Sequence, residues 1–165
     1  MIKPTPEQAV VDALAKIVLN NLENQHDWTG VQIHTQADLQ RPVIYGLPPK
    51  RLYVHPDEQV ALIKAEKDRA QRIPQPPELE WVLPLSLAEK WTPAQFAAVL
   101  DTLDNIPPTN GSDDGSDDAD DEGIAEWRQW RGPKRGKRIL LATVQDDSTV
   151  TYYIMHDGLV KPRQN

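Results

Sequence analysis

A basic and aromatic stretch near the C-terminal end carries side chains suited to contact with nucleic acid. Between residues 127 and 138, two tryptophans are interspersed with six lysines and arginines. Cationic groups neutralise phosphates and indole rings stack on unpaired bases, so this composition is typical of an RNA contact. Such a run can equally be a solvated loop or pair with the acidic run before it, and nothing in it specifies a nucleotide sequence. The candidate RNA-contacting residues are Trp127, Arg128, Trp130, Arg131, Lys134, Arg135 and Lys137.

A short acidic turn between residues 145 and 148 is the second candidate site. It separates two runs of branched and aromatic residues, Ile139–Val144 and Thr149–Met155. This pattern predicts a β-hairpin with turn-forming residues at its tip. From composition alone, Asp146 and Asp147 are most simply turn formers.

The second arm of this hairpin carries large side chains on both faces. Val150, Tyr152 and Ile154 alternate with Thr151, Tyr153 and Met155. A strand with one solvated face would instead alternate apolar and polar residues. The arm is therefore expected either to lie centrally in its sheet or to meet another protein with one face and edge. Core packing alone also explains the pattern.

The rest of the sequence predicts the elements that position these residues. Thr5, Pro6 and Gln8 form a helix-start signal, and the segment after residue 91 repeats it. In order, the predicted elements are a helix from Pro6, strands at Val31–Thr35, Pro42–Leu47 and Arg51–His55, a helix at Pro56–Arg72, a strand at Leu79–Leu85, a helix capped by Thr92 and ending near Leu103, and the closing hairpin. This order indicates an α+β domain with a mixed sheet and flanking helices.

The composition fits one domain with an acidic insertion. The chain has 165 residues, the usual size of one domain with tails. Seven acidic residues between positions 113 and 122 equal the whole formal net charge of −7, so the remainder is neutral. Residues 107–123 contain too little apolar surface to offset the entropy of ordering. They are predicted to be a disordered insertion within a single domain spanning residues 1–165.

Several kinds of site and location are not expected. The sequence has no cysteine and four scattered histidines, which excludes a thiolate site and argues against a metal or cofactor site. It has no apolar run near the roughly 18 residues needed to span a bilayer. Glu7 and Asp12 interrupt the N-terminal segment, which therefore does not read as a signal sequence. A soluble intracellular protein is expected.

Two stretches of the chain resemble a known family. The sequence QDDSTVTYYI at 145–154 and the ending HDGLV at 156–160 are similar to the C-terminal end of one subunit of the eukaryotic tRNA-splicing endonuclease. That subunit is the smallest, non-catalytic (Sen-fifteen-type) one. The stretch EWVLPL at 80–85, followed by Trp91, Thr92 and Phe96, also resembles it.

The resemblance implies a fold and a function. The chain would have the family's nuclease-like fold and would be a structural subunit of the enzyme that removes introns from precursor tRNA. Catalytic subunits of that family use a tyrosine, a histidine and a lysine, and here no histidine occurs between Pro56 and Met155. Lys134 and Lys137 are therefore interpreted as solvated charges, and no catalytic residue is expected.

The resemblance also implies partners. In the family, the acidic loop of the structural subunit enters a basic pocket on a catalytic subunit of the opposite dimer, a role that would fall on Asp146 and Asp147. Subunits pair through the C-terminal strand and tail, here Val150, Tyr152, Tyr153, Ile154, Leu159 and Val160. The closest partner in a heterotetramer would be the smaller catalytic subunit, and precursor tRNA would be contacted indirectly or weakly. The isolated chain can form a homodimer through the same strand.

Location and two rival functions stay open at this point. The nucleus is the expected location for tRNA splicing, although some lineages hold this enzyme at the mitochondrial surface. The rivals are a stand-alone RNA-binding module that uses residues 127–138 and a degenerate ribonuclease. Copurifying catalytic subunits would favour the structural subunit, and lone RNA affinity with a steep salt dependence would favour the RNA-binding module.

Overall fold

Five strands form one mixed sheet in the computed structural model of the chain, which describes residues 3, 5–109, 126–132 and 135–158. In chain order they are β1 (Thr29–His34), β2 (Val43–Leu47), β3 (Glu80–Ser86), β4 (Arg138–Val144) and β5 (Val150–His156). They lie side by side in that same order, with β3 and β4 parallel and the other neighbours antiparallel. The predicted α+β class, mixed sheet and closing hairpin are confirmed.

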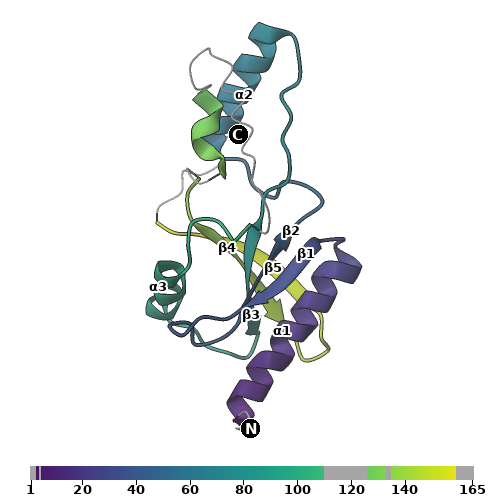
Figure 1. Cartoon of the computed structure of the whole chain (residues 1–165), viewed down its shortest axis with the longest axis vertical. Helices are drawn as coiled ribbons and strands as arrows, with labels where there is room; N and C mark the ends of the chain where they lie inside the picture. The colour runs from purple at the N-terminus through teal and green to yellow at the C-terminus, as the bar shows by residue number, and fades with distance from the viewer. Residues whose placement is uncertain (1–2, 4, 110–125, 133–134, 159–165) are drawn as a thin grey trace.

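Helices pack on both faces of this sheet (Figure 1). α1 (Pro6–Gln25) covers one face, and α3 (Pro93–Thr102) covers the other. Alternate residues of β3 supply the two cores, since Val82 packs under α1 and Leu83 packs under α3. The central strands are therefore apolar on both sides, as expected for strands covered by helices on both faces.

A third helix stands beyond one end of the sheet (Figure 1). α2 (Pro56–Arg69) packs there against the short 3-10 helix η1 (Glu126–Trp130). Ala61, Leu62 and Trp127 form a small core between them, separate from the two cores of the sheet. η1 lies in the basic stretch, for which the sequence predicted no regular structure.

The predicted helix-start signals are confirmed. The Thr5 hydroxyl oxygen accepts the backbone N–H of Gln8 at 3.2 Å at the start of α1. At α3, Thr92 accepts the N–H of Gln95 at 3.3 Å, and the Gln95 side chain accepts the N–H of Thr92 at 2.8 Å. These reciprocal bonds satisfy N–H groups that have no partner within the helix.

The predicted strand at Arg51–His55 is wrong. β1 and β3 already pair with both edges of β2, so no position beside it is open to the next segment. Residues 51–55 instead lead away from the sheet to α2, where His55 Nδ1 accepts the N–H of Asp57 at 3.1 Å. α2 also ends before the predicted limit at residue 72, because Ala70 adopts a left-handed φ of 52°.

Part of the sequence prediction lies outside the described residues. Of the predicted insertion, the structure describes residues 107–109, and Pro107 is buried there. Residues 110–123, like Lys134, Leu159 and Val160, belong to the part that the structure does not describe. None of the described helices is both long enough and apolar enough to cross a membrane.

Candidate functional site

The acidic turn forms the tip of the β4–β5 hairpin and points its carboxylates to solvent. The backbone N–H of Gln145 donates to the Thr149 carbonyl at 2.9 Å, and that of Ser148 donates back to Gln145 at 2.9 Å. Ser148 adopts a left-handed φ of 67° to close the turn. Asp146 and Asp147 are both exposed, so the turn presents two negative charges side by side.

Local hydrogen bonds hold the second of these carboxylates in place. Asp147 Oδ1 accepts the backbone N–H of Thr149 at 3.0 Å. Hydrogen bonds from the side chain and backbone of Thr149 lower the pKa of Asp147. The carboxylate therefore stays ionised at neutral pH and keeps one orientation on the turn.

An apolar side chain lies beside the acidic turn. Leu87 and Ala88 line a shallow hollow of about 450 Å³ together with residues 145–147. The backbone N–H of Leu87 donates to the Val144 carbonyl at 2.9 Å, which ties the end of β3 to the hairpin. Leu87 is 62% exposed. Sequence reasoning missed this residue because it is far from the turn along the chain.

β5 is an edge strand of the sheet and carries exposed apolar side chains. It pairs with β4 on one side, and no described strand pairs with its other side. Tyr153 is 57% exposed and Ile154 is 40% exposed. A free edge of this kind offers unpaired backbone groups to another chain. Of the two readings of this arm, the structure excludes a central position in the sheet.

The other two described candidates on β5 face inward. Val150 and Tyr152 pack against the core beneath α1. The Tyr152 hydroxyl donates to Asn21 Oδ1 of α1 at 2.6 Å. Burial raises the pKa of Tyr152, which keeps this hydroxyl protonated as the donor. These two residues therefore hold α1 on the sheet.

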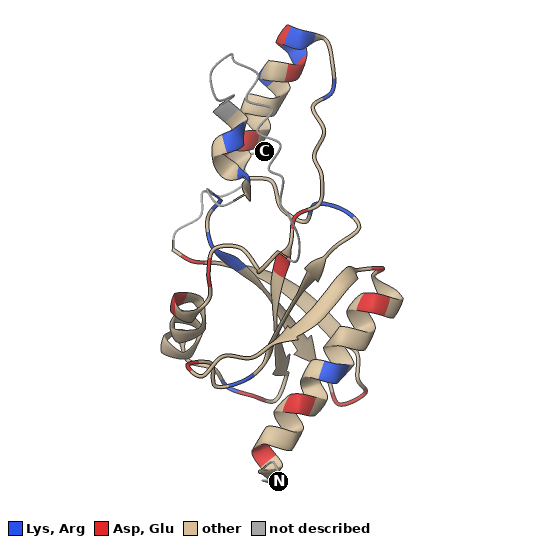
Figure 2. Ribbon diagram, viewed as in Figure 1, with Lys and Arg blue, Asp and Glu red and all other residues tan. Residues whose placement is uncertain are grey.

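Three of the six cations of the basic stretch take part in a buried ionic cluster at the junction of the sheet with α2 and η1. We call it the arginine–glutamate cluster, and its members are Arg51, Arg131, Arg135, Arg138, Glu58, Glu78 and Glu80. Figure 2 shows charged residues of both signs gathered at this junction. Three arginines of the stretch thus bind carboxylates that lie more than fifty residues away in the sequence.

The cluster is closely bonded. Both terminal nitrogens of Arg51 donate to Glu58 at 2.7 Å, and Arg131 Nε donates to the same carboxylate at 3.0 Å. Arg138 Nε donates to both oxygens of Glu80 at 3.1 Å. Burial alone would lower the pKa of Arg138, but its bonds to Glu80 raise it. Arg138 therefore stays charged, and the cluster joins α2 and η1 to the sheet.

The remaining candidates of the basic stretch lie around this cluster. Trp127 is buried in the core between α2 and η1, with the Arg131 guanidinium 4.3 Å from its ring centroid. Arg128 is exposed, and its guanidinium carbon lies 5.3 Å from the same ring centroid. Lys137 Nζ donates to the Leu100 carbonyl at 2.7 Å. Trp130 stacks on His55, with 5.4 Å between the ring centroids and 15° between the planes.

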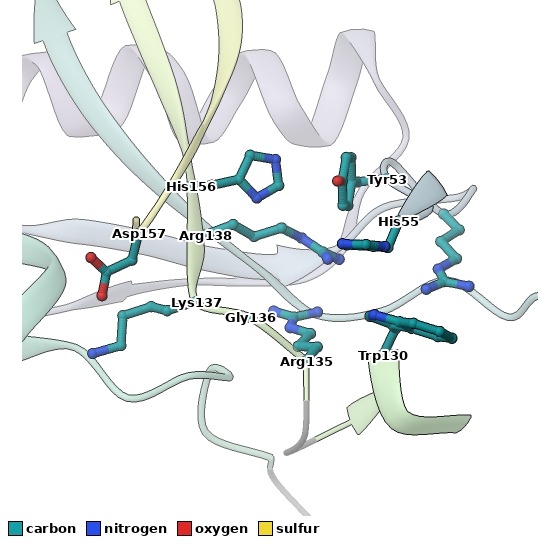
Figure 3. A pocket seen from close by; sticks show the side chains of 10 residues that line it. Tyr53, His55, Trp130, Arg135, Gly136, Lys137, Arg138, His156 and Asp157 are labelled. Atoms are coloured by element: carbon teal, nitrogen blue, oxygen red, sulfur yellow. The ribbon is translucent and has the colours of Figure 1, made fainter. Parts of the chain in front are cut away.

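A cavity of about 220 Å³ opens beside the cluster, and we call it the basic pocket (Figure 3). It is lined by Arg51, Tyr53, His55, Trp130, Arg135, Gly136, Lys137, Arg138, His156 and Asp157. The rings of Tyr53 and His156 are 4.4 Å apart between centroids. Sequence reasoning did not single out Tyr53, His55 or His156 as a site, because they come from the loop before α2 and from the end of β5.

The electrostatics of the basic pocket are positive. Burial lowers the pKa of His156, and the charges of Arg138 and His55 lower it further. Burial raises the pKa of Tyr53, despite an opposing effect of Arg138. At neutral pH the pocket therefore contains a neutral imidazole of His156 and a protonated phenol beside permanent guanidinium charges.

Comparison with known proteins identifies one family. The model of the family described as Sen15 protein matches residues 17–113 and 121–165. The chain is 68% identical over 155 residues to the probable tRNA-splicing endonuclease subunit tsp-1 of Neurospora crassa, which covers 94% of this chain and 67% of that protein. It is 26% identical over 152 residues to the tRNA-splicing endonuclease subunit SEN15 of Eremothecium gossypii, covering 92% of this chain and 91% of that protein.

Proposed function

The chain belongs to the Sen15 protein family, and on that basis we propose that it is a non-catalytic, structural subunit of a tRNA-splicing endonuclease. In this role it would support assembly of the complex that removes introns from precursor tRNA. The observation that carries the proposal is the edge of β5, with which no other described strand than β4 pairs and which has exposed Tyr153 and Ile154, next to a turn that presents two carboxylates. Two distinct surfaces are what a subunit with two neighbours needs.

The first surface is the edge of β5, and it would form a dimer with the smaller catalytic subunit, which we call the close dimer. A strand from the smaller catalytic subunit could extend the sheet at β5, because the edge offers backbone groups without a described partner. Tyr153 and Ile154 lie on opposite faces of β5. Both would lose their exposed apolar surface to the partner. In the absence of that partner, a second copy of this chain can occupy the same edge.

The second surface would recruit the opposite pair of subunits into a heterotetramer. Asp146 and Asp147 would enter a positively charged cleft on a catalytic subunit of the opposite pair. Charge-assisted hydrogen bonds to the two carboxylates would be strong there. Leu87 would add apolar contact beside the two charges. Protein–protein interfaces commonly combine a buried apolar core with a polar rim in this way.

Charge reversal at the turn tests the second surface. Asp146→Lys together with Asp147→Lys changes exposed side chains and loses only the local bond from Thr149 to Asp147, so the chain should remain folded. The two lysines would bring positive charge against the positively charged cleft of the catalytic subunit. This repulsion should cost several kcal/mol of binding free energy and slow association. Coexpression with the other three subunits and size-exclusion chromatography should therefore give the close dimer but not the tetramer.

A control variant carries the same change of charge elsewhere. Asp68→Lys with Asp101→Lys reverses two exposed acids on α2 and α3, away from the turn. This variant should form the tetramer normally. A full tetramer from the variant altered at the turn would show that Asp146 and Asp147 only form a turn.

A second experiment tests the β5 edge. Tyr153→Lys together with Ile154→Lys should abolish the close dimer while the chain remains folded, because Tyr153 is 57% and Ile154 is 40% exposed. Copurification with the smaller catalytic subunit measures the result. Undiminished copurification would contradict pairing through β5.

One of the two rival functions is metal-free RNA cleavage, and one observation favours it. Tyr53, His55 and His156 share the basic pocket with several cations, and RNA cleavage uses a base, an acid and a cation. Against it, the pKa of Tyr53 is raised and the Lys137 ammonium is bonded to a backbone carbonyl. The purified chain, free of other subunits, should leave precursor tRNA intact with or without magnesium. Cuts at both intron boundaries that disappear in His156→Gln would overturn the non-catalytic role.

A nuclear location is part of the same proposal, since the expected substrate is precursor tRNA. Fluorescence microscopy of a tagged copy expressed from its own promoter measures the location. Fluorescence confined to the mitochondrial surface would contradict it.

A further inference from the structure

We infer that the basic pocket binds a phosphate group of an RNA strand. The proposal adds a ligand site to the assembly role, and it depends on the proposed function only in the choice of RNA as the source of the phosphate. The site would be formed by Arg51, Tyr53, Arg135, Arg138 and His156, which line one cavity (Figure 3).

Unused hydrogen-bond donors are the first observation. The Nε–H groups of Arg51 and Arg135 and the hydroxyl of Tyr53 are buried and have no acceptor among the described residues. The Arg51 side chain is 4% exposed and that of Arg135 is 2% exposed. Buried donors are normally bonded, so three such groups around one cavity indicate an absent acceptor. A phosphate group has the oxygens to accept from several of them.

The balance of charge around the basic pocket is the second observation. Among the residues that the structure describes, four cationic side chains line it, against the carboxylate of Asp157. Within the arginine–glutamate cluster, four arginines are paired with three glutamates, which leaves a positive excess of one. Figure 3 shows Lys137 and Asp157 extending together, away from Tyr53 and His55. The acidic group therefore lies at the margin of the cavity, and its centre is positive.

The aromatic lining favours a nucleotide over an acidic peptide. Trp130 and His55 stack at one wall, and Tyr53 and His156 lie together at another. Planar rings beside guanidinium groups are the combination by which proteins hold single-stranded RNA, because bases and riboses pack on rings while phosphates meet the cations. The cavity of about 220 Å³ also far exceeds the roughly 10–15 Å³ that one water requires.

His156 provides a reporter within the site. Its imidazole faces the positive charge of Arg138, which contributes to its lowered pKa together with burial. A bound phosphate would offset that charge and stabilise the protonated ring, so the pKa of His156 should rise on binding. A role of His156 in packing alone would produce no such change.

The test uses the full-length chain with inorganic phosphate and with a uridine hexanucleotide as probes. Histidine ring signals are followed by NMR during each titration. Both probes should shift the signals of His55 and His156 but not those of His26 and His34, which are outside the pocket. Both should also raise the pKa of His156.

Variants locate the binding. His156→Glu puts a carboxylate beside Arg138 and should weaken hexanucleotide affinity at least tenfold, as measured by calorimetry. Gln36→Glu makes the same change of charge at an exposed residue outside the pocket and should alter affinity less than twofold. If His156→Glu does not fold, Tyr53→Phe, which removes an unpaired hydroxyl, should still weaken binding severalfold.

Four outcomes would overturn the inference. Unchanged hexanucleotide affinity in His156→Glu or, if that variant does not fold, in Tyr53→Phe would place any binding elsewhere. Phosphate binding without hexanucleotide binding would mean that the pocket takes a free anion. An affinity for a hexaglutamate peptide equal to that for the hexanucleotide would mean that the pocket takes an acidic protein segment. Shifts confined to histidines outside the pocket would also exclude it. Copurification of the other subunits with His156→Glu would show that the assembly role survives whatever the RNA result.

Discussion

Replacement of Glu58 by alanine tests whether the arginine–glutamate cluster joins α2 and η1 to the sheet. The Glu58 side chain is 0% exposed and accepts three hydrogen bonds, two from Arg51 and one from Arg131. Glu58→Ala removes both acceptor oxygens, and with them all three hydrogen bonds, and leaves two guanidinium groups at the junction. It also raises the positive excess of the cluster.

The expected cost follows from the burial of these charges. Removing one partner of a buried ion pair typically costs about 3–5 kcal/mol, because the remaining charge is left without compensation. For a chain of this size each kcal/mol lowers the melting temperature by about 2–4 °C, so the decrease should be roughly 6–20 °C. α2 and η1 should loosen first, since their own core is small.

The measurement is urea unfolding followed by circular dichroism, together with amide hydrogen exchange. Gln59→Ala is the control, because it alters the adjacent, exposed residue of the same helix and should change stability by only about 0.5 kcal/mol. Exchange in Glu58→Ala should accelerate more in α2 than in β3. A loss of less than about 1 kcal/mol, or equal acceleration in both elements, would refute the structural role of the cluster.

Three further predictions concern single residues. Tyr152→Phe loses the hydrogen bond to Asn21 and should lower the unfolding free energy by about 0.5–1.5 kcal/mol in urea titrations; no change would mean that the bond is replaced by water. The pKa of folded His156 lies below the ordinary value of 6.5, so the unfolded state binds more protons between the two values. Stability should therefore be complete above pH 6.5 and fall as the pH drops toward the folded pKa, and His156→Gln should remove this part of the pH dependence; an identical profile in the variant would contradict the shift. Leu87→Ala should keep its stability but weaken tetramer formation in size-exclusion chromatography, and undiminished tetramer would exclude Leu87 from the interface.

Features that depend on neighbouring residues could be predicted from the sequence. The caps at Thr5 and Thr92 are hydrogen bonds across three residues, so the spacing of the side chains is enough to identify them. The β4–β5 hairpin is likewise local, because a short turn brings adjacent arms together in a fixed register. The family resemblance rests mainly on this same hairpin and turn.

Other features depend on which strands become neighbours. The segment at Arg51–His55 has the composition of a strand, but β1 and β3 pair with both sides of β2 and leave no place for it. β5 is apolar on both faces, and its position at an edge follows only from the order of the sheet. The order of strands in a sheet depends on the whole chain. Side chains alternate between the two faces in the same way in a central strand and in an edge strand, so this alternation does not show where in the sheet a strand lies.

The sequence by itself determined the presence of the three α-helices, the caps at Thr5 and Thr92, the closing hairpin, the α+β class and the family. Tertiary structure decided what the charged stretch does, since Arg131, Arg135 and Arg138 pair with Glu58, Glu78 and Glu80 from distant segments. It also created the basic pocket, by bringing the loop before α2 against the end of β5. The reason is physical: caps and turns form between residues close in the chain, whereas a buried charge is stable only where folding brings its partner within a few ångströms.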